Sequence, residues 1–109
     1  MVCVIFTVME LYDVLVAINK YVERIIMRKF PELTSFDVEM SRSRRIIPDH
    51  IRHKHPEGTE FFLIDVKFNL DDMENKRRDD LYESIKDMIK FLSLPEQFNV
   101  RHYLESNQK

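Results

Sequence analysis

Three residues near the middle of the chain have the types and the spacing for chemistry on a phosphate group. Asp65 and Lys67 are two positions apart in the mostly apolar run 60–68, so both side chains would lie on one face of a strand. A charged carboxylate in such a strand is costly unless a partner compensates its charge. Upstream, Asp49 follows a proline, and we expect residues 46–52 and 60–68 to form adjacent strands. Asp49 and Asp65 would then converge on one divalent cation, with Lys67 beside it.

The spacing of these residues resembles a known nuclease motif. Residues 48–49 (Pro-Asp), fifteen intervening residues and residues 65–67 (Asp-Val-Lys) are similar to the PD-(D/E)xK motif of restriction-endonuclease-like nucleases. Residues 22–26 and the basic residues 41–45 make the chain look most like archaeal Holliday-junction resolvases. The segments around the motif are also similar to those of viral cap-snatching endonucleases. The resemblance covers roughly residues 20–104.

The resemblance implies an endonuclease that hydrolyses the phosphodiester bonds of DNA or RNA with the help of a metal ion. It implies that Asp49 and Asp65 bind Mg²⁺ or Mn²⁺ and that Val66 offers its carbonyl oxygen to the ion. Lys67 would position or activate the attacking water. The cation would stabilise the charge that develops on the phosphate and lower the pKa of a bound water.

A helix glutamate joins the metal ligands in the enzymes that the chain resembles. Glu23 has the corresponding place in this sequence. Glu10 or Glu39 could replace it, because only the fold decides which carboxylate points into the site. The sequence therefore does not decide which of these three glutamates supplies the third carboxylate of the metal site.

A basic stretch in the middle of the chain could hold the phosphates of a bound nucleic acid. The formal charge of the whole chain is −2, from 17 Lys and Arg against 19 Asp and Glu, so the attraction would have to come from a local patch. The residues of this patch are Arg42, Arg44, Arg45, Arg52 and Lys54. The alternative interpretation is a solvated loop.

Hydrophobic periodicity predicts the elements that must position these residues. In order, they are a helix over 8–30, a strand over 36–41, a segment over 42–58 that includes turns or an exposed loop, a strand over 60–68, a helix over 81–92 and a strand over 98–104. The strand over 60–68 is expected to be central, with helices above and below it. Pro95 leaves a short helix as the alternative to the last strand. The order indicates an α/β fold with a mixed central sheet flanked by helices.

The resemblance specifies this fold as a restriction-endonuclease-like core, and a ferredoxin-like α+β fold is the alternative. A length of 109 residues suits a single domain, residues 1–109. Cys3 is the only cysteine and cannot form an internal disulfide, which favours a reducing compartment. The sequence shows no membrane span and no secretion signal, so we expect a soluble, cytoplasmic protein. A nuclease that makes paired cuts would need a homodimer.

A different class of protein is compatible with the same residues. In the simplest alternative, Asp65 and Lys67 form an ion pair with each other at the end of a strand on the sheet surface and have no catalytic role. The rival function is that of a non-catalytic nucleic-acid-binding or virion-assembly module. Its sheet would have four strands, over residues 2–6, 35–45, 60–68 and 98–104, covered by two helices.

Overall fold

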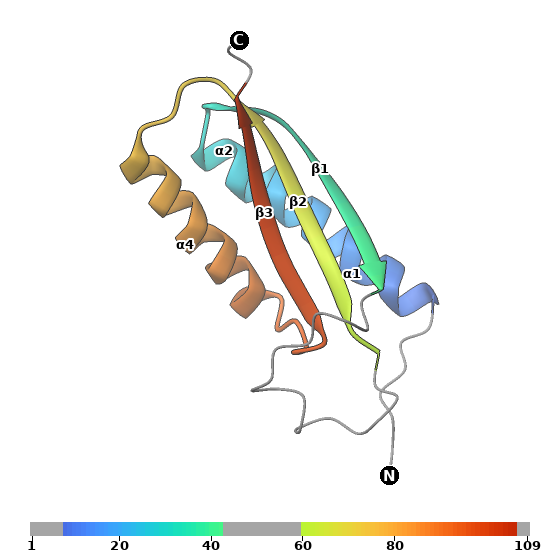
Figure 1. The fold of residues 1–109 in the computed structure, drawn as a ribbon. Coiled ribbons are helices and arrows are strands. Elements are labelled where there is room, and N and C mark those ends of the chain that lie inside the picture. Colours follow the sequence, from blue (N-terminus) through green and yellow to red (C-terminus); the bar gives the residue numbers. More distant parts are fainter. Residues whose placement is uncertain (1–7, 43–59, 107–109) are drawn as a thin grey trace.

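The structure, a computed structural model, describes residues 8–42 and 60–106 of the chain. In chain order, the elements are α1 (Val8–Tyr21), the π-helix η1 (Val22–Ile26), α2 (Met27–Lys29), β1 (Leu33–Arg42), β2 (Phe62–Leu70), α4 (Asn75–Phe91) and β3 (Phe98–Ser106) (Figure 1). The first three elements follow one another without a break and form one long helix. Within the described residues, the predicted order of helices and strands, including the last strand, is confirmed. None of the helices in this part of the chain is both long and apolar enough to cross a membrane.

The three strands form one mixed sheet in the order β1-β2-β3. β1 pairs with β2 in the antiparallel sense, and β3 pairs with β2 in the parallel sense. A parallel pair needs a crossover connection, which α4 provides between β2 and β3. The predicted α/β class with a mixed sheet is therefore confirmed, and β2 is the central strand as expected.

The first long helix and α4 both pack on the same face of the sheet. The core combines Ile18, Val22 and Ile26 of the first long helix, Leu81, Ile85 and Met88 of α4, and Phe62, Ile64, Val66 and Phe68 of β2. Asp65 and Lys67 alternate with these core residues, so they lie on the opposite face, which we call the open face. Within residues 8–42 and 60–106, no helix packs on the open face. The expectation of helices above and below β2 is therefore wrong for this part of the chain.

A cluster at the end of the first long helix ties it to the start of α4. The helix ends at Lys29, and the next residue, Phe30, has a non-helical ψ of 84°, because the residue before Pro31 is disfavoured in helical conformation. Arg77 Nε and Nη2 donate hydrogen bonds to the two carboxylate oxygens of Glu32 at 2.8 and 3.0 Å. The guanidinium of Arg77 also lies 4.5 Å from the centre of the Phe30 ring. These contacts hold the start of α4 against the turn before β1.

Candidate functional site

The open face carries a cross-strand row of three charged residues. Asp65 of β2 lies opposite Glu39 of β1 on one side and opposite Arg101 of β3 on the other. In the next row on this face, Lys67 lies opposite Tyr103 of β3. Directly opposite residues of an antiparallel pair have Cβ atoms about 4.5–5.5 Å apart, so Glu39 and Asp65 are neighbours in the sheet, although each carboxylate is hydrogen-bonded to a different cation, Lys67 and Arg101.

Asp65 forms a two-pronged ion pair with Arg101. Arg101 Nε donates to Asp65 Oδ1 at 2.8 Å, and Arg101 Nη2 donates to Asp65 Oδ2 at 3.1 Å. These hydrogen bonds are the main cause of a raised pKa of the Arg101 guanidinium. The pair supplies the compensating charge that a carboxylate in an apolar strand requires.

Lys67 lies opposite Asp37 of β1 but forms its ion pair with Glu39, its diagonal neighbour on that strand. Lys67 Nζ donates to Glu39 Oε2 at 3.2 Å, and both side chains are largely exposed. The hydrogen bond to Glu39 is the largest cause of a raised pKa of the Lys67 ammonium, followed by the charge of Glu39 and, more weakly, the charges of Asp37 and Asp65. Lys67 is therefore a cation at neutral pH.

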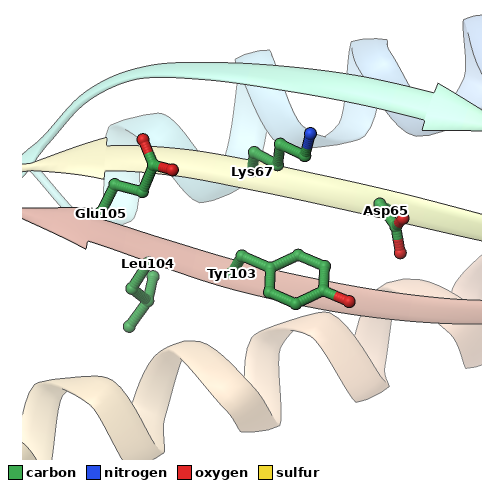
Figure 2. Close-up of a pocket in the computed structure, with 5 residues that line it drawn as sticks. All are labelled: Asp65, Lys67, Tyr103, Leu104 and Glu105. Atoms are coloured by element: carbon green, nitrogen blue, oxygen red, sulfur yellow. The ribbon is translucent and has the colours of Figure 1, made fainter.

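A shallow, open hollow of about 460 Å³ adjoins these pairs, lined by Asp65, Lys67, Tyr103, Leu104 and Glu105. Figure 2 shows the side chains of Asp65, Lys67 and Tyr103 on the side of the sheet that faces away from the helices. Sequence reasoning missed the residues that β3 contributes here. Period-two alternation places Tyr103 and Glu105 on one face of a strand, but it does not reveal which residues of β2 they accompany.

The carboxylates of the open face are compatible with a restricted class of metal ion. Within residues 8–42 and 60–106, no group of three or more His, Cys, Asp or Glu side chains could hold a metal ion. Glu39 and Asp65 offer two hard carboxylates. Mg²⁺ often keeps several waters and binds through only one or two carboxylates and a substrate phosphate. Both carboxylates could hold an ion that binds together with a phosphate only if Arg101 leaves Asp65 and Lys67 leaves Glu39.

Asp49, the predicted partner of Asp65, lies outside the described residues. The strand expected over residues 46–52 also lies outside the described residues and stays a prediction, and the described neighbours of β2 at Asp65 are β1 and β3. The carboxylate that the sheet does bring to Asp65 is that of Glu39.

The other implied metal ligands do not join Asp65 on the open face. Glu23 belongs to η1, whose buried residues are part of the core on the opposite face of the sheet. Glu10 lies in α1, in the same helical layer. The side chain of Val66 is fully buried in the core, and its peptide groups lie in a strand paired on both sides. Of the three glutamates that the sequence left open, only Glu39 shares a face with Asp65.

The predicted basic patch is described only at its first residue. Arg42 ends β1 with an exposed side chain, and its Nε lies 3.7 Å from Glu60 Oε2. The other four basic residues of the patch lie outside the described residues, so the patch as a whole stays a prediction.

Comparison with known proteins gives no match. No protein-family model, no curated protein and no solved structure is similar to this chain. Functional assignment therefore depends on the chemistry of the open face.

Proposed function

We propose that this chain is a divalent-metal-dependent endonuclease that hydrolyses phosphodiester bonds of DNA or RNA on the open face of its sheet. One observation carries the proposal: Glu39, Asp65 and Lys67 lie together on that face, beside an open hollow. Two carboxylates next to a lysine are the parts that a metal-assisted attack on phosphate needs.

Each residue has a distinct task in this proposal. Glu39 and Asp65 would hold the ion by their carboxylate oxygens. The ion, Mg²⁺ or Mn²⁺, would stabilise charge on the phosphate and make a bound water more acidic. Lys67 would contribute positive charge to the phosphate and would not accept a proton, because the hydrogen bond to Glu39 raises its pKa. Asp49 and the basic residues after Arg42 remain candidates for further contacts with the ion and the nucleic acid.

The finer fold assignment belongs to the same proposal. A restriction-endonuclease-like core is supported by a mixed sheet in which the strand with the Asp-x-Lys triplet is followed by a crossover helix and a parallel strand. A reducing cytoplasmic location is supported by the single cysteine. A homodimer would follow only if the enzyme makes paired cuts.

A cleavage assay tests the proposal directly. The protein is incubated with branched, duplex and single-stranded DNA and with RNA, in Mg²⁺, in Mn²⁺ and in a chelator. We expect metal-dependent cleavage that falls by about 100-fold or more in Asp65→Asn and in Lys67→Met. Glu74→Gln and Lys76→Met are matched controls, because they alter a second acid-x-Lys triplet at the start of α4 and should leave cleavage unchanged. Cleavage that survives in Asp65→Asn would remove Asp65 from the site.

A second candidate is the non-catalytic module. It is favoured by the observation that Asp65 and Lys67 are both already neutralised by neighbours, Arg101 and Glu39. Such pairs are expected of residues that only stabilise the surface of a sheet. A protein that binds nucleic acid in the assay above but never cuts it, in any of the metal ions, would support this candidate over the nuclease.

A further inference from the structure

We propose that Arg101 is a latch, which keeps divalent cations away from Asp65 until a phosphodiester draws the guanidinium off. The inference rests on the proposed function, because it concerns the order in which the same site takes up cation and nucleic acid. Its consequence is that each of the two ligands strengthens the binding of the other.

The first step of the argument is that Arg101 occupies the place where a cation would have to bind. Its Nε and Nη2 donate to both oxygens of Asp65. The Asp65 side chain is only 19% exposed, whereas Lys67, on the same open face, is 45% exposed. A cation approaching Asp65 would therefore meet a positive group and two oxygens that already accept hydrogen bonds.

The second step is that a phosphate can compete for Arg101. The planar guanidinium fork matches the oxygens of a phosphate as well as it matches a carboxylate. The Arg101 side chain is 39% exposed, so an incoming phosphate can reach it. A phosphate at this place would also meet the ammonium of Lys67, which lines the hollow. The positively charged side chains of Arg101 and Lys67 would then both contact the phosphate.

The third step is that the structure offers Arg101 a path away from Asp65. The guanidinium carbon of Arg101 lies 5.6 Å from the centre of the Tyr103 ring, and Tyr103 lines the hollow. An aromatic face attracts a guanidinium, so the side chain can move along the ring toward a phosphate without losing all of its contacts. The guanidinium of Arg101 would then no longer block a divalent cation from reaching Asp65.

The latch predicts a coupling between the two ligands that must be equal in both directions. If nucleic acid raises the affinity for the cation by some factor, the cation raises the affinity for nucleic acid by the same factor. We expect a factor of about 10 or more, within the usual range for coupled sites. Without Arg101, the factor should fall toward one.

The test measures Mn²⁺ affinity of the full chain by calorimetry and by the electron paramagnetic resonance of unbound Mn²⁺. The probes are short DNA duplexes and single strands with phosphorothioate linkages, which resist hydrolysis, and inorganic phosphate as a control for unattached anions. Arg101→Gln removes the positive charge, and Arg101→Lys keeps the charge but loses the fork. Arg28→Gln is the matched control, because Arg28 is exposed on α2 in the helical layer. Circular dichroism verifies that each variant is folded.

The expected results and the contrary ones are distinct. Wild type should bind Mn²⁺ weakly alone and about tenfold more tightly with an oligonucleotide. Arg101→Gln should bind Mn²⁺ alone as tightly as wild type does with the oligonucleotide, with Arg101→Lys between the two and Arg28→Gln like wild type. If Arg101→Gln and wild type bind Mn²⁺ equally well alone, and Asp65→Asn abolishes binding, the latch is refuted while the metal site survives. If neither binds Mn²⁺ under any condition, the latch and the nuclease fail together.

Discussion

Arg101 and Asp65 are 36 positions apart in the sequence, yet they face each other directly in the parallel register of β2 and β3. The guanidinium binds both oxygens of the carboxylate, at 2.8 and 3.1 Å. In the proposed latch, Asp65 takes up a cation only after Arg101 has moved away from it. Glu39 and Lys67, the other two members of the site, stand beside it and are paired with each other.

Glu39 is expected to be the second carboxylate of the metal site. Glu39→Gln should lower the rate of metal-dependent cleavage by about 100-fold and weaken Mn²⁺ binding, because it removes the charge opposite Asp65. Glu23→Gln is the matched control and should have little effect, because Glu23 lies in the helical layer on the other side of the sheet. If Glu23→Gln instead had the larger effect on cleavage and Mn²⁺ binding, Glu23 and not Glu39 would be the second carboxylate ligand.

The two faces of β2 should differ sharply in their contribution to stability. Phe68 is fully buried beneath the helices, so Phe68→Ala should lower the free energy of unfolding by about 3–5 kcal/mol. Asn69, the next residue, lies on the open face and donates to Ser35 Oγ at 2.9 Å. Asn69→Ala should therefore lower it by about 1 kcal/mol or less. Urea unfolding measures both values, and comparable losses would mean that the open face is covered as well.

The contact between Glu32 and Arg77 should make stability fall in acid. The hydrogen bonds from Arg77 hold the pKa of Glu32 at about 2, against a usual value of 4.5. The unfolded chain takes up this proton first, so the stabilisation is complete above about pH 4.5 and is lost as the pH falls toward 2. The difference in unfolding free energy between wild type and Glu32→Gln should shrink over that interval. Glu83→Gln, in an exposed pair with Lys86, should show a small difference throughout, and an equal response in both variants would contradict the prediction.

His102 should produce a second dependence on pH, at higher values. It lies on β3 with its ring 5.6 Å from that of Tyr82 on α4, and burial lowers its pKa below the usual 6.5. Below about pH 6.5 the unfolded chain binds a proton that the folded chain resists, so folding becomes less favourable as the pH falls. His102→Gln should flatten this slope in thermal melts, whereas Tyr82→Phe, which keeps the ring, should retain it. A slope unchanged in His102→Gln would assign the effect to other groups.

The local features of the fold could be predicted from the sequence. Alternation along β2 correctly placed Asp65 and Lys67 on one face, because the side-chain period of a strand depends only on neighbouring residues. The end of the first long helix was also predictable, because Pro31 acts on the residue just before it. The residue types of Asp65 and Lys67 can likewise be read from the sequence without a structure.

The neighbours of Asp65 could not be predicted in the same way. From the sequence, Asp49 was expected beside Asp65. In the sheet, Asp65 lies opposite Glu39 of β1 and Arg101 of β3. A strand offers two edges to any other strand, and the choice depends on which pairing buries the most apolar surface over the whole domain. Packing over the whole domain also decides which face of the sheet the helices cover. The residues of one strand do not reveal it, so the sequence led to the wrong expectation of helices on both faces.

The sequence by itself determined which elements form, which face of β2 is polar, and that a carboxylate and an amine share that face. The tertiary structure alone decided that Arg101 covers the carboxylate and that Glu39 holds the amine. The physical reason is that these contacts join strands far apart in the chain, whose register is set when Val66 and its alternate neighbours are buried beneath the helices.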